Sequence, residues 1–139
     1  MTTPRKDRKP FQFRLDVASG VPAYRQIIDQ VMSGMAAGAL EAGDQLPTVR
    51  QLAVDLAVNP NTVLRAYREL EIKGVLETQQ GTGTFVSHQK VKRDEAERQR
   101  YLTQLAGECL ARAGAAGFTA RELLEALRGF QDDLNENRR

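Results

Sequence analysis

The stretch that most constrains the fold runs from Leu46 to Leu70 and reads as two short helices joined by a tight turn. Apolar residues recur every three or four positions on both sides of the turn, which gives each helix one buried face. Thr48 lies three residues before Gln51, a capping-box spacing, although Pro47 blurs which residue is the cap. In the turn, Asn59 is a good N-cap and the proline after it suits the first helical position. The expected core residues are Leu46, Val49, Leu52, Ala53 and Leu56 in the first helix, then Val63, Ala66, Tyr67 and Leu70 in the second.

The second of these helices has a polar side that faces outward. That side begins at the helix N-terminus with short hydrogen-bonding side chains. In a helix-turn-helix, such N-terminal residues reach the base edges of DNA while the first helix crosses the backbone. An ordinary helical hairpin with a solvated face would show the same pattern, so both interpretations stay open here. The outward residues are Asn61, Thr62, Arg65, Arg68 and Glu69.

A β-hairpin is predicted directly after the second helix. Gly74 closes that helix, and two strand-like segments, 75–78 and 84–87, flank a glycine-containing loop. Gly81 and Gly83 allow positive φ and a close approach to a phosphate backbone or minor-groove wall, although a tight turn would need glycine as well. Helix, turn, helix and hairpin is the order of a winged helix. The predicted fold is therefore mostly α with a small β-hairpin wing, and DNA binding is the favoured function.

Several segments of this region carry a family resemblance. They are Pro22–Ile27, Gly43–Ala53, Val58–Val63, Arg65–Tyr67 and Gly81–Val86, and together they cover roughly residues 11–86. The sequence resembles the GntR family of bacterial transcription regulators, and more narrowly its YtrA-like subfamily. The resemblance implies a dimer that binds operator DNA and commonly represses genes for transport systems. Thr48 stands where the family often has serine, which keeps the hydroxyl.

Predicted DNA-contact residues come from both helices and from the hairpin. Arg50 is the leading candidate, because it lies on the outward side of its helix and the resemblance assigns the matching arginine to operator recognition. Arg65 is assigned either to a guanine edge or to a phosphate. The N-terminus of the second helix also favours phosphate through its dipole. The full predicted set is Thr48, Arg50, Asn59, Asn61, Thr62, Arg65, Gly81, Thr82, Gly83 and Thr84.

The segment before the helix-turn-helix is expected to complete the same domain, residues 11–88. Residues 1–10 form a basic tail that is predicted to be disordered, and residues 11–15 alternate apolar and polar as in a short strand. The first helix of the domain begins at residues 21–24. Its apolar side is expected to be core: Tyr24, Ile27, Ile28, Val31, Met32 and Met35. For Tyr24, a hydroxyl placed near a phosphate is the alternative.

Residues 89–139 are predicted to form a helical dimerisation region. Thr119 with Glu122 is a capping-box signal for the last helix, after a glycine-containing break. Two amphipathic helices bury too little surface to form a core of their own. A symmetric dimer suits a palindromic operator, and completing a monomer is the alternative. The predicted dimerisation residues are Tyr101, Leu102, Leu105, Cys109, Leu123, Leu124 and Leu127.

No part of the sequence nominates a catalytic centre. His88 is the only histidine, and no cysteine or carboxylate cluster is spaced for zinc. Cys109 is the only cysteine, which excludes an internal disulfide, fits a reducing bacterial cytoplasm and favours a small core hydrophobe over a redox sensor. No signal peptide or membrane-spanning run is recognised. The sequence therefore predicts no enzyme, no metal site and no cofactor.

Two other functions compete with that of a dimeric repressor. The net charge of the 139 residues is only +2, so the case for DNA rests on where charges lie and not on their sum. A winged helix that docks another protein would lack the steep salt dependence of DNA binding. An architectural protein would bind DNA with little preference for one sequence. A small-molecule effector in the dimer cleft is left open, since no residue nominates a ligand.

Overall fold

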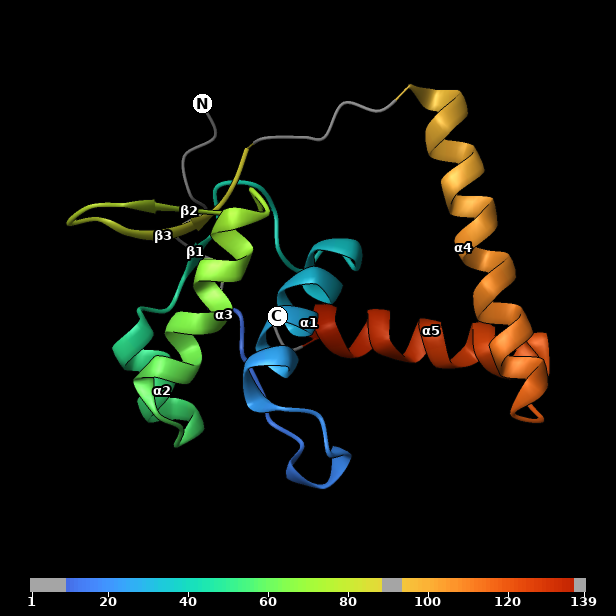
Figure 1. Ribbon diagram of the computed structural model, residues 1–139, viewed down its shortest axis with the longest axis horizontal. Helices are drawn as coiled ribbons and strands as arrows, with labels where there is room; N and C mark the ends of the chain where they lie inside the picture. The colour runs from blue at the N-terminus through green and yellow to red at the C-terminus, as the bar shows by residue number, and fades with distance from the viewer. Residues whose placement is uncertain (1–9, 89–93, 137–139) are drawn as a thin grey trace. The chain divides into compact units, whose positions relative to one another are not determined.

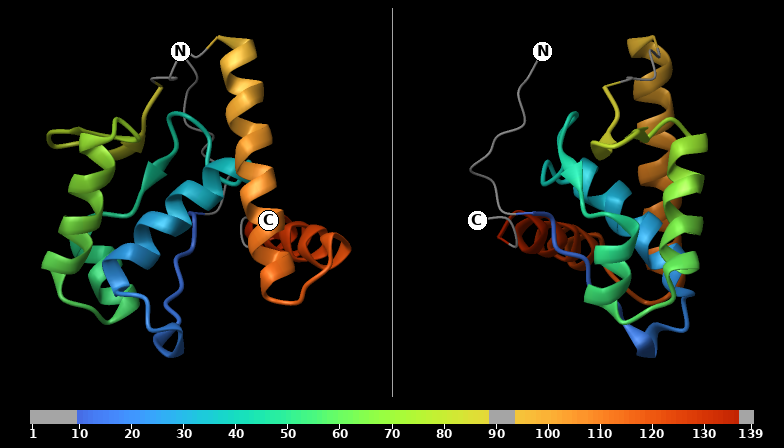
Figure 2. Two further views of the ribbon diagram at one scale, coloured as in Figure 1. Left: turned by 45° about the vertical axis from the view of Figure 1, so that its right-hand side comes forward. Right: turned by 90° about the vertical axis from the view of Figure 1, so that its left-hand side faces the viewer.

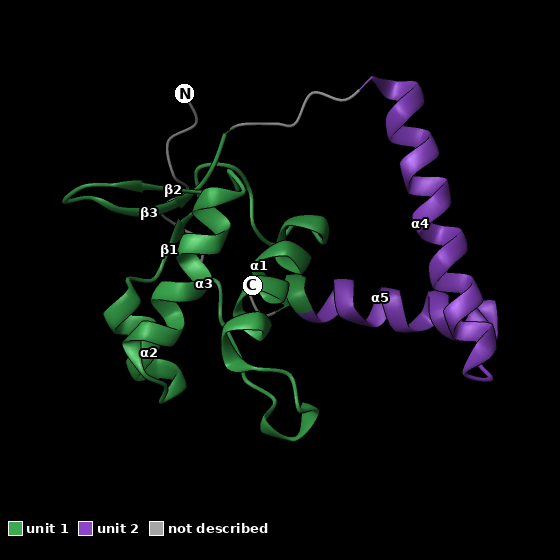
Figure 3. Cartoon of the chain, viewed as in Figure 1, with its two compact units in different colours: residues 1–89, 134–139 green, residues 90–133 purple. Residues whose placement is uncertain are grey.

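The computed structural model describes residues 10–88 and 94–136. The chain divides into two compact units, residues 1–89 with 134–139 and residues 90–133 (Figure 3). Of the predicted basic tail, only Pro10 falls inside the described residues. Residues 89–93, where the charged segment after the wing begins, also lie outside them.

The first unit is a winged helix-turn-helix, which confirms the predicted fold class. Its helices are α1 (Ala23–Ala36), α2 (Val49–Leu56) and α3 (Pro60–Ile72), preceded by a short 3-10 helix, η1 (Val17–Ser19). Strands β2 (Leu76–Gln79) and β3 (Gly83–Val86) form the hairpin beside the C-terminal end of α3 (Figure 1). The views in Figure 2 show the three helices grouped together next to this hairpin.

A third strand corrects the predicted start of the helix-turn-helix. Leu46 is buried as expected, but it belongs to strand β1 (Gln45–Leu46) and not to α2. β1 pairs antiparallel with β3, with Leu46 opposite Thr84, so the sheet order is β1-β3-β2. Pro47 is the physical reason, because the residue before a proline is driven out of the α region into an extended conformation.

The strand predicted over residues 11–15 does not form, although its alternating burial is present. Phe11 and Phe13 are both buried and meet edge to face, with ring centroids 5.0 Å apart. The backbone of this segment pairs with side chains of α1 instead of a strand. Gln30 Oε1 accepts from the Arg14 N–H at 2.8 Å, and Gln26 Oε1 accepts from the Asp16 N–H at 2.8 Å. Because these glutamines are four residues apart, they lie on one face of α1 and hold the segment against it.

The core of the first unit lies between the three helices and the sheet. Ile27, Val31 and Val63 are completely buried, and Tyr24 is partly buried against the same cluster. Met35, predicted as core, is exposed. Its neighbour Gly34 is the buried residue there, because a Cβ on Gly34 would lie 2.9 Å from Phe11 Cε2 and 3.1 Å from Leu40 Cδ1. The remaining core residues are Ile28, Ala39, Leu40, Leu52, Ala53, Ala66, Tyr67, Leu70, Leu76 and Val86.

The C-terminal region forms the two predicted helices, α4 (Glu95–Ala115) and α5 (Ala120–Glu136). The capping box that starts α5 is present in both directions. The Glu122 N–H donates to Thr119 Oγ1 at 3.1 Å, and the Thr119 N–H donates to Glu122 Oε1 at 3.2 Å. Neither helix has a buried residue among those described, and Cys109 is exposed.

The close approach of Phe11 to α1 makes Gly34 sensitive to a single added methyl group. We expect Gly34→Ala to lower the free energy of unfolding by about 1–2 kcal/mol, because overpacking outweighs the ~1 kcal/mol that alanine gains in helix propensity. Urea denaturation measures this, with Ser33→Ala, an exposed neighbour on α1, as the control. Equal stability of the two variants would contradict the packing described here.

Candidate nucleic-acid interface

The turn between α2 and α3 is built from local capping interactions. Thr48 Oγ1 accepts from the Gln51 N–H at 3.1 Å and begins α2. The Gln51 side chain does not return to Thr48 but donates to Asp55 Oδ1 at 2.8 Å, so the capping box is one-sided. Ala57, at φ 54°, ends α2 in the left-handed region. Asn59 Oδ1 then accepts from the Asn61 N–H at 2.8 Å and begins α3. The caps predicted at Thr48 and Asn59 are both confirmed.

A partly buried hydrogen bond links α3 to the segment just before α2. The Tyr67 hydroxyl donates to the Pro47 carbonyl oxygen at 2.7 Å. The Tyr67 ring is 2 % exposed, and burial raises the pKa of its hydroxyl well above the ordinary value. The hydroxyl therefore stays protonated and remains a donor at physiological pH. This bond joins the centre of α3 to the residue just before the α2 cap.

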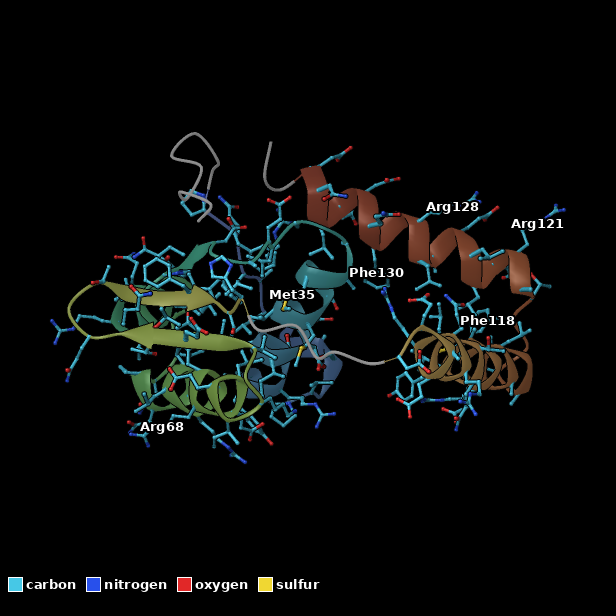
Figure 4. The ribbon with its side chains drawn as sticks, turned by 90° about the horizontal axis from the view of Figure 1, so that it is seen from above. Met35, Arg68, Phe118, Arg121, Arg128 and Phe130 are labelled. Atoms are coloured by element: carbon cyan, nitrogen blue, oxygen red, sulfur yellow. The ribbon has the colours of Figure 1, made fainter. Side chains whose placement is uncertain are left out.

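One face of α3 is exposed along its whole length. Asn61, Arg65, Arg68 and Ile72 lie three or four residues apart, so they form a single stripe opposite the buried residues. Figure 4 shows the Arg68 side chain pointing away from the ribbon. Helical spacing predicts Arg68 on the outward side of α3, but Arg68 is not among the predicted DNA contacts. Its spacing of three from Arg65 was the signal that could have included it.

Arg65 is held in place by two neighbours. Its guanidinium carbon lies 3.7 Å from the centroid of the Tyr24 ring, on α1. Its Nε lies 4.0 Å from Glu69 Oε1, one turn along α3. Both side chains of this ion pair are exposed to solvent, so the pair contributes little to stability. The ring contact is the closer of the two interactions.

The hairpin tip depends on both of its glycines for its backbone. Gly81 has φ 78° and Gly83 has φ 138°. A Cβ on Gly83 would lie 2.5 Å from Gln45 Nε2, which donates to the Thr82 carbonyl oxygen at 3.2 Å. A side chain on Gly83 would therefore displace the end of the Gln45 side chain, whereas nothing lies within 4 Å of a Cβ on Gly81. The positive φ at both positions is what favours glycine. The tight-turn interpretation thus applies to both residues.

Thr84 is the predicted contact whose side chain is withdrawn from the surface. It is 9 % exposed, and its Oγ1 lies 3.5 Å from that of Thr78 on the paired strand. Thr78 in turn donates to Glu71 on α3. The cause is the alternation of β3, which turns Thr84 and Val86 to the buried face. The Thr84 hydroxyl thus contacts Thr78, which in turn links the wing to α3.

The structure brings the other predicted contacts to the surface of the first unit. Thr48, Arg50, Asn59, Asn61, Arg65, Gly81 and Thr82 are exposed, and Thr62 and Gly83 are partly exposed. Neither α2 nor α3 has an acidic residue in its first turn. Both N-termini therefore keep the positive end of the helix dipole, which favours a phosphate nearby.

Other kinds of site find little support in the described residues. Within 10–88 and 94–136, no three His, Cys, Asp or Glu side chains gather as metal ligands would. In the same ranges, no helix combines the length and the apolar character needed to cross a membrane.

Comparison with known proteins identifies the family. Residues 23–86 match the bacterial regulatory proteins of the gntR family. The HTH-type transcriptional regulator Rv1152 of Mycobacterium tuberculosis is 42 % identical over 120 residues, which cover 86 % of this chain and 94 % of that protein. The chain belongs to the gntR family. That membership places it among transcriptional regulators and not among enzymes.

Further gntR-family relatives agree with the YtrA-like assignment. The transcriptional repressor YtrA of Bacillus subtilis is 46 % identical over 74 residues, 53 % of this chain and 57 % of that one. A GntR family transcriptional regulator from Listeria monocytogenes has the same architecture, with a TM-score of 0.57 and 31 % identity over 83 % of this chain and 98 % of its own. This chain is thus a short gntR-family regulator of the YtrA-like kind.

The cap at Asn59 provides a direct test of how α3 is anchored. We expect Asn59→Ala to lower the free energy of unfolding by about 1 kcal/mol, because the Asn61 N–H then loses its acceptor. Asn61→Ala is the matched control, since its exposed side chain makes no cap and its loss costs less than about 0.5 kcal/mol. Chemical denaturation of both variants measures the difference. If the two variants are equally stable, the Asn59 cap does not stabilise α3.

Proposed function

We propose that this protein is a dimeric, sequence-specific DNA-binding repressor that recognises a palindromic operator. The observation that carries the proposal is the exposed stripe of Asn61, Arg65 and Arg68 on a capped α3, in a member of the gntR family. Polar and cationic side chains at this position of a helix-turn-helix suit the floor of the major groove. The B. subtilis relative is itself named a repressor.

Each part of the interface has a distinct role in this proposal. The N-terminal residues of α3, Asn61 and Thr62, contact base edges or phosphates from within the groove. Arg50, exposed in the first turn of α2, contacts the operator beside them. The hairpin tip at Gly81 and Thr82 reaches a minor groove. We leave the Thr84 side chain out of this set, because it is buried.

Dimerisation is assigned to the apolar faces of α4 and α5. Five predicted interface residues are each 45–57 % exposed: Tyr101, Leu102, Leu105, Leu124 and Leu127. Cys109 is exposed as well, and Leu123 is partly so. Phe118 and Phe130 add further exposed apolar surface to the same unit (Figure 4). Large apolar side chains along two helices mark an interaction surface, and a second copy of the chain supplies the same pattern.

A palindromic operator follows from the symmetry of a dimer. Regulation of a transporter operon and a small-molecule effector stay predictions, because the first rests on the family resemblance and no residue nominates a ligand for the second.

Selection from randomised DNA tests the function directly. Duplexes bound by the full chain are recovered at a low and a high salt concentration and sequenced. We expect a two-fold symmetric motif that persists at the higher salt, because base contacts discriminate sequence while phosphate contacts weaken with salt. Enrichment that vanishes at high salt would indicate an architectural protein, and absence of binding at both would favour a protein-docking module.

The selected duplex then tests Arg50. We expect Arg50→Ala to weaken binding about tenfold or more while the melting temperature is unchanged, since the side chain is exposed. Arg100→Ala is the control, because it removes the same charge from an exposed position of α4. Fluorescence anisotropy with a labelled duplex measures both. Parent-like affinity of Arg50→Ala would remove Arg50 from the interface.

The dimer has its own test on α4. We expect Leu105→Glu to shift the protein from dimer to monomer, because a carboxylate buried in an apolar interface has no partner. Thr103→Glu adds the same charge on the side of α4 away from Leu105 and is the control. Sedimentation equilibrium at several concentrations measures the change. If Leu105→Glu stays dimeric, another surface joins the two copies.

A further inference from the structure

Tyr24 joins the core of the first unit to the exposed face of α3. It lies in the first turn of α1 and is only partly buried, with one side packed against the core. The other side of its ring lies against Arg65, in the second turn of α3. An aromatic residue of α1 thus reaches the exposed face of the recognition helix.

The contact is of the cation–π kind. A guanidinium carbon 3.7 Å from the ring centroid places the planar group against the face of the ring. The negative face of an aromatic ring attracts a cation there, and arginine adds stacking of its own plane. Contact through the face leaves the guanidinium N–H groups, which point outward in its plane, available for other acceptors.

Glu69 engages only a small part of the N–H edge of the Arg65 guanidinium. Its carboxylate lies 4.0 Å from Nε, and both side chains are largely solvent-exposed. The terminal N–H groups of Arg65 are the ones that match a pair of acceptors in one plane. Such pairs on DNA are two oxygens of a phosphate, or O6 and N7 of a guanine in the major groove.

We propose that Tyr24 is a positioning residue for DNA recognition, which holds Arg65 in the orientation that presents its N–H edge to one such acceptor pair. This inference rests on the proposed function. A long arginine side chain loses rotamer freedom when it is ordered by a partner. Because the ring orders Arg65 before DNA arrives, that loss does not oppose binding. The Tyr24 hydroxyl has no part in the mechanism.

The central test compares a ringless variant with one that keeps the ring. We expect Tyr24→Leu to weaken binding of the selected labelled duplex about threefold to thirtyfold, and Tyr24→Phe to bind within about twofold of the parent. Arg65→Ala should weaken binding of the duplex at least as much as Tyr24→Leu does. The double variant Tyr24→Leu/Arg65→Ala should be no weaker than Arg65→Ala alone, because the ring acts through the guanidinium.

A measurement without DNA separates positioning from a general effect on the fold. The side-chain Nε–H of Arg65 should become more mobile in NMR relaxation of Tyr24→Leu than of Tyr24→Phe. Melting temperatures show whether each variant is folded at the assay temperature. If Tyr24→Leu is not, Tyr24→Met is the second ringless variant, since methionine fills irregular apolar space.

The nature of the acceptor follows from duplexes with single base-pair changes. If Arg65 reads guanine, Arg65→Ala loses discrimination at one position of the motif. If it binds phosphate, all duplexes weaken alike and the salt dependence falls by about one counterion. Either result supports the inference when Tyr24→Leu reproduces it.

Two results would overturn the inference, and they can be told apart from failure of the proposed function. Parent-like binding by Tyr24→Leu would show that the ring is not needed. Losses that add fully in the double variant would show that Tyr24 acts without Arg65. Absence of binding by the parent chain to every duplex would instead remove the proposed function, and this inference with it.

Discussion

The hydrogen bond from the Tyr67 hydroxyl to the Pro47 carbonyl joins α3 to the segment that also contacts α2 and the wing. That segment is residues 45–48, and each member contacts a different part. Gln45 holds the hairpin tip through the Thr82 carbonyl, Leu46 pairs with β3, and Thr48 caps α2. Because α2, α3 and the wing all meet at four consecutive residues, their relative positions are set by one short stretch of chain. Displacing any of these contacts would move one element of the proposed DNA interface relative to the others.

Features that depend on neighbouring residues could be predicted from the sequence. The caps at Thr48, Asn59 and Thr119 need only a side chain and an N–H two or three residues away, and all three form. The buried faces of α3 and of most of α1 follow from helical spacing in the same way. Local chemistry decides these features, so a single sequence is enough to find them.

Features that depend on distant partners were predicted less well. The 11–15 segment has the alternation of a strand, but Gln26 and Gln30 supply the hydrogen bonds that a strand partner would have given. Leu46 has the spacing of a helix residue and is diverted into the sheet by Pro47. The burial of Thr84 depends on which face of β3 is turned toward the core. For residues 11–15 and for Thr84 the alternation is correct and a long-range contact decides the outcome, whereas for Leu46 the adjacent proline overrides the helical spacing.

The contact between Tyr24 and Arg65 was invisible to sequence reasoning for the same reason, since it joins residues on two different helices. It also bears on how a chain with a net charge of only +2 could recognise DNA. A small net charge supplies little long-range attraction, so in the proposed interface the placement of individual charges matters more than their sum. An arginine that is already ordered before binding loses less conformational entropy when it binds, so less of its interaction energy is offset. In the proposed interface, preorganisation of single side chains such as Arg65 is therefore one physical route to specificity.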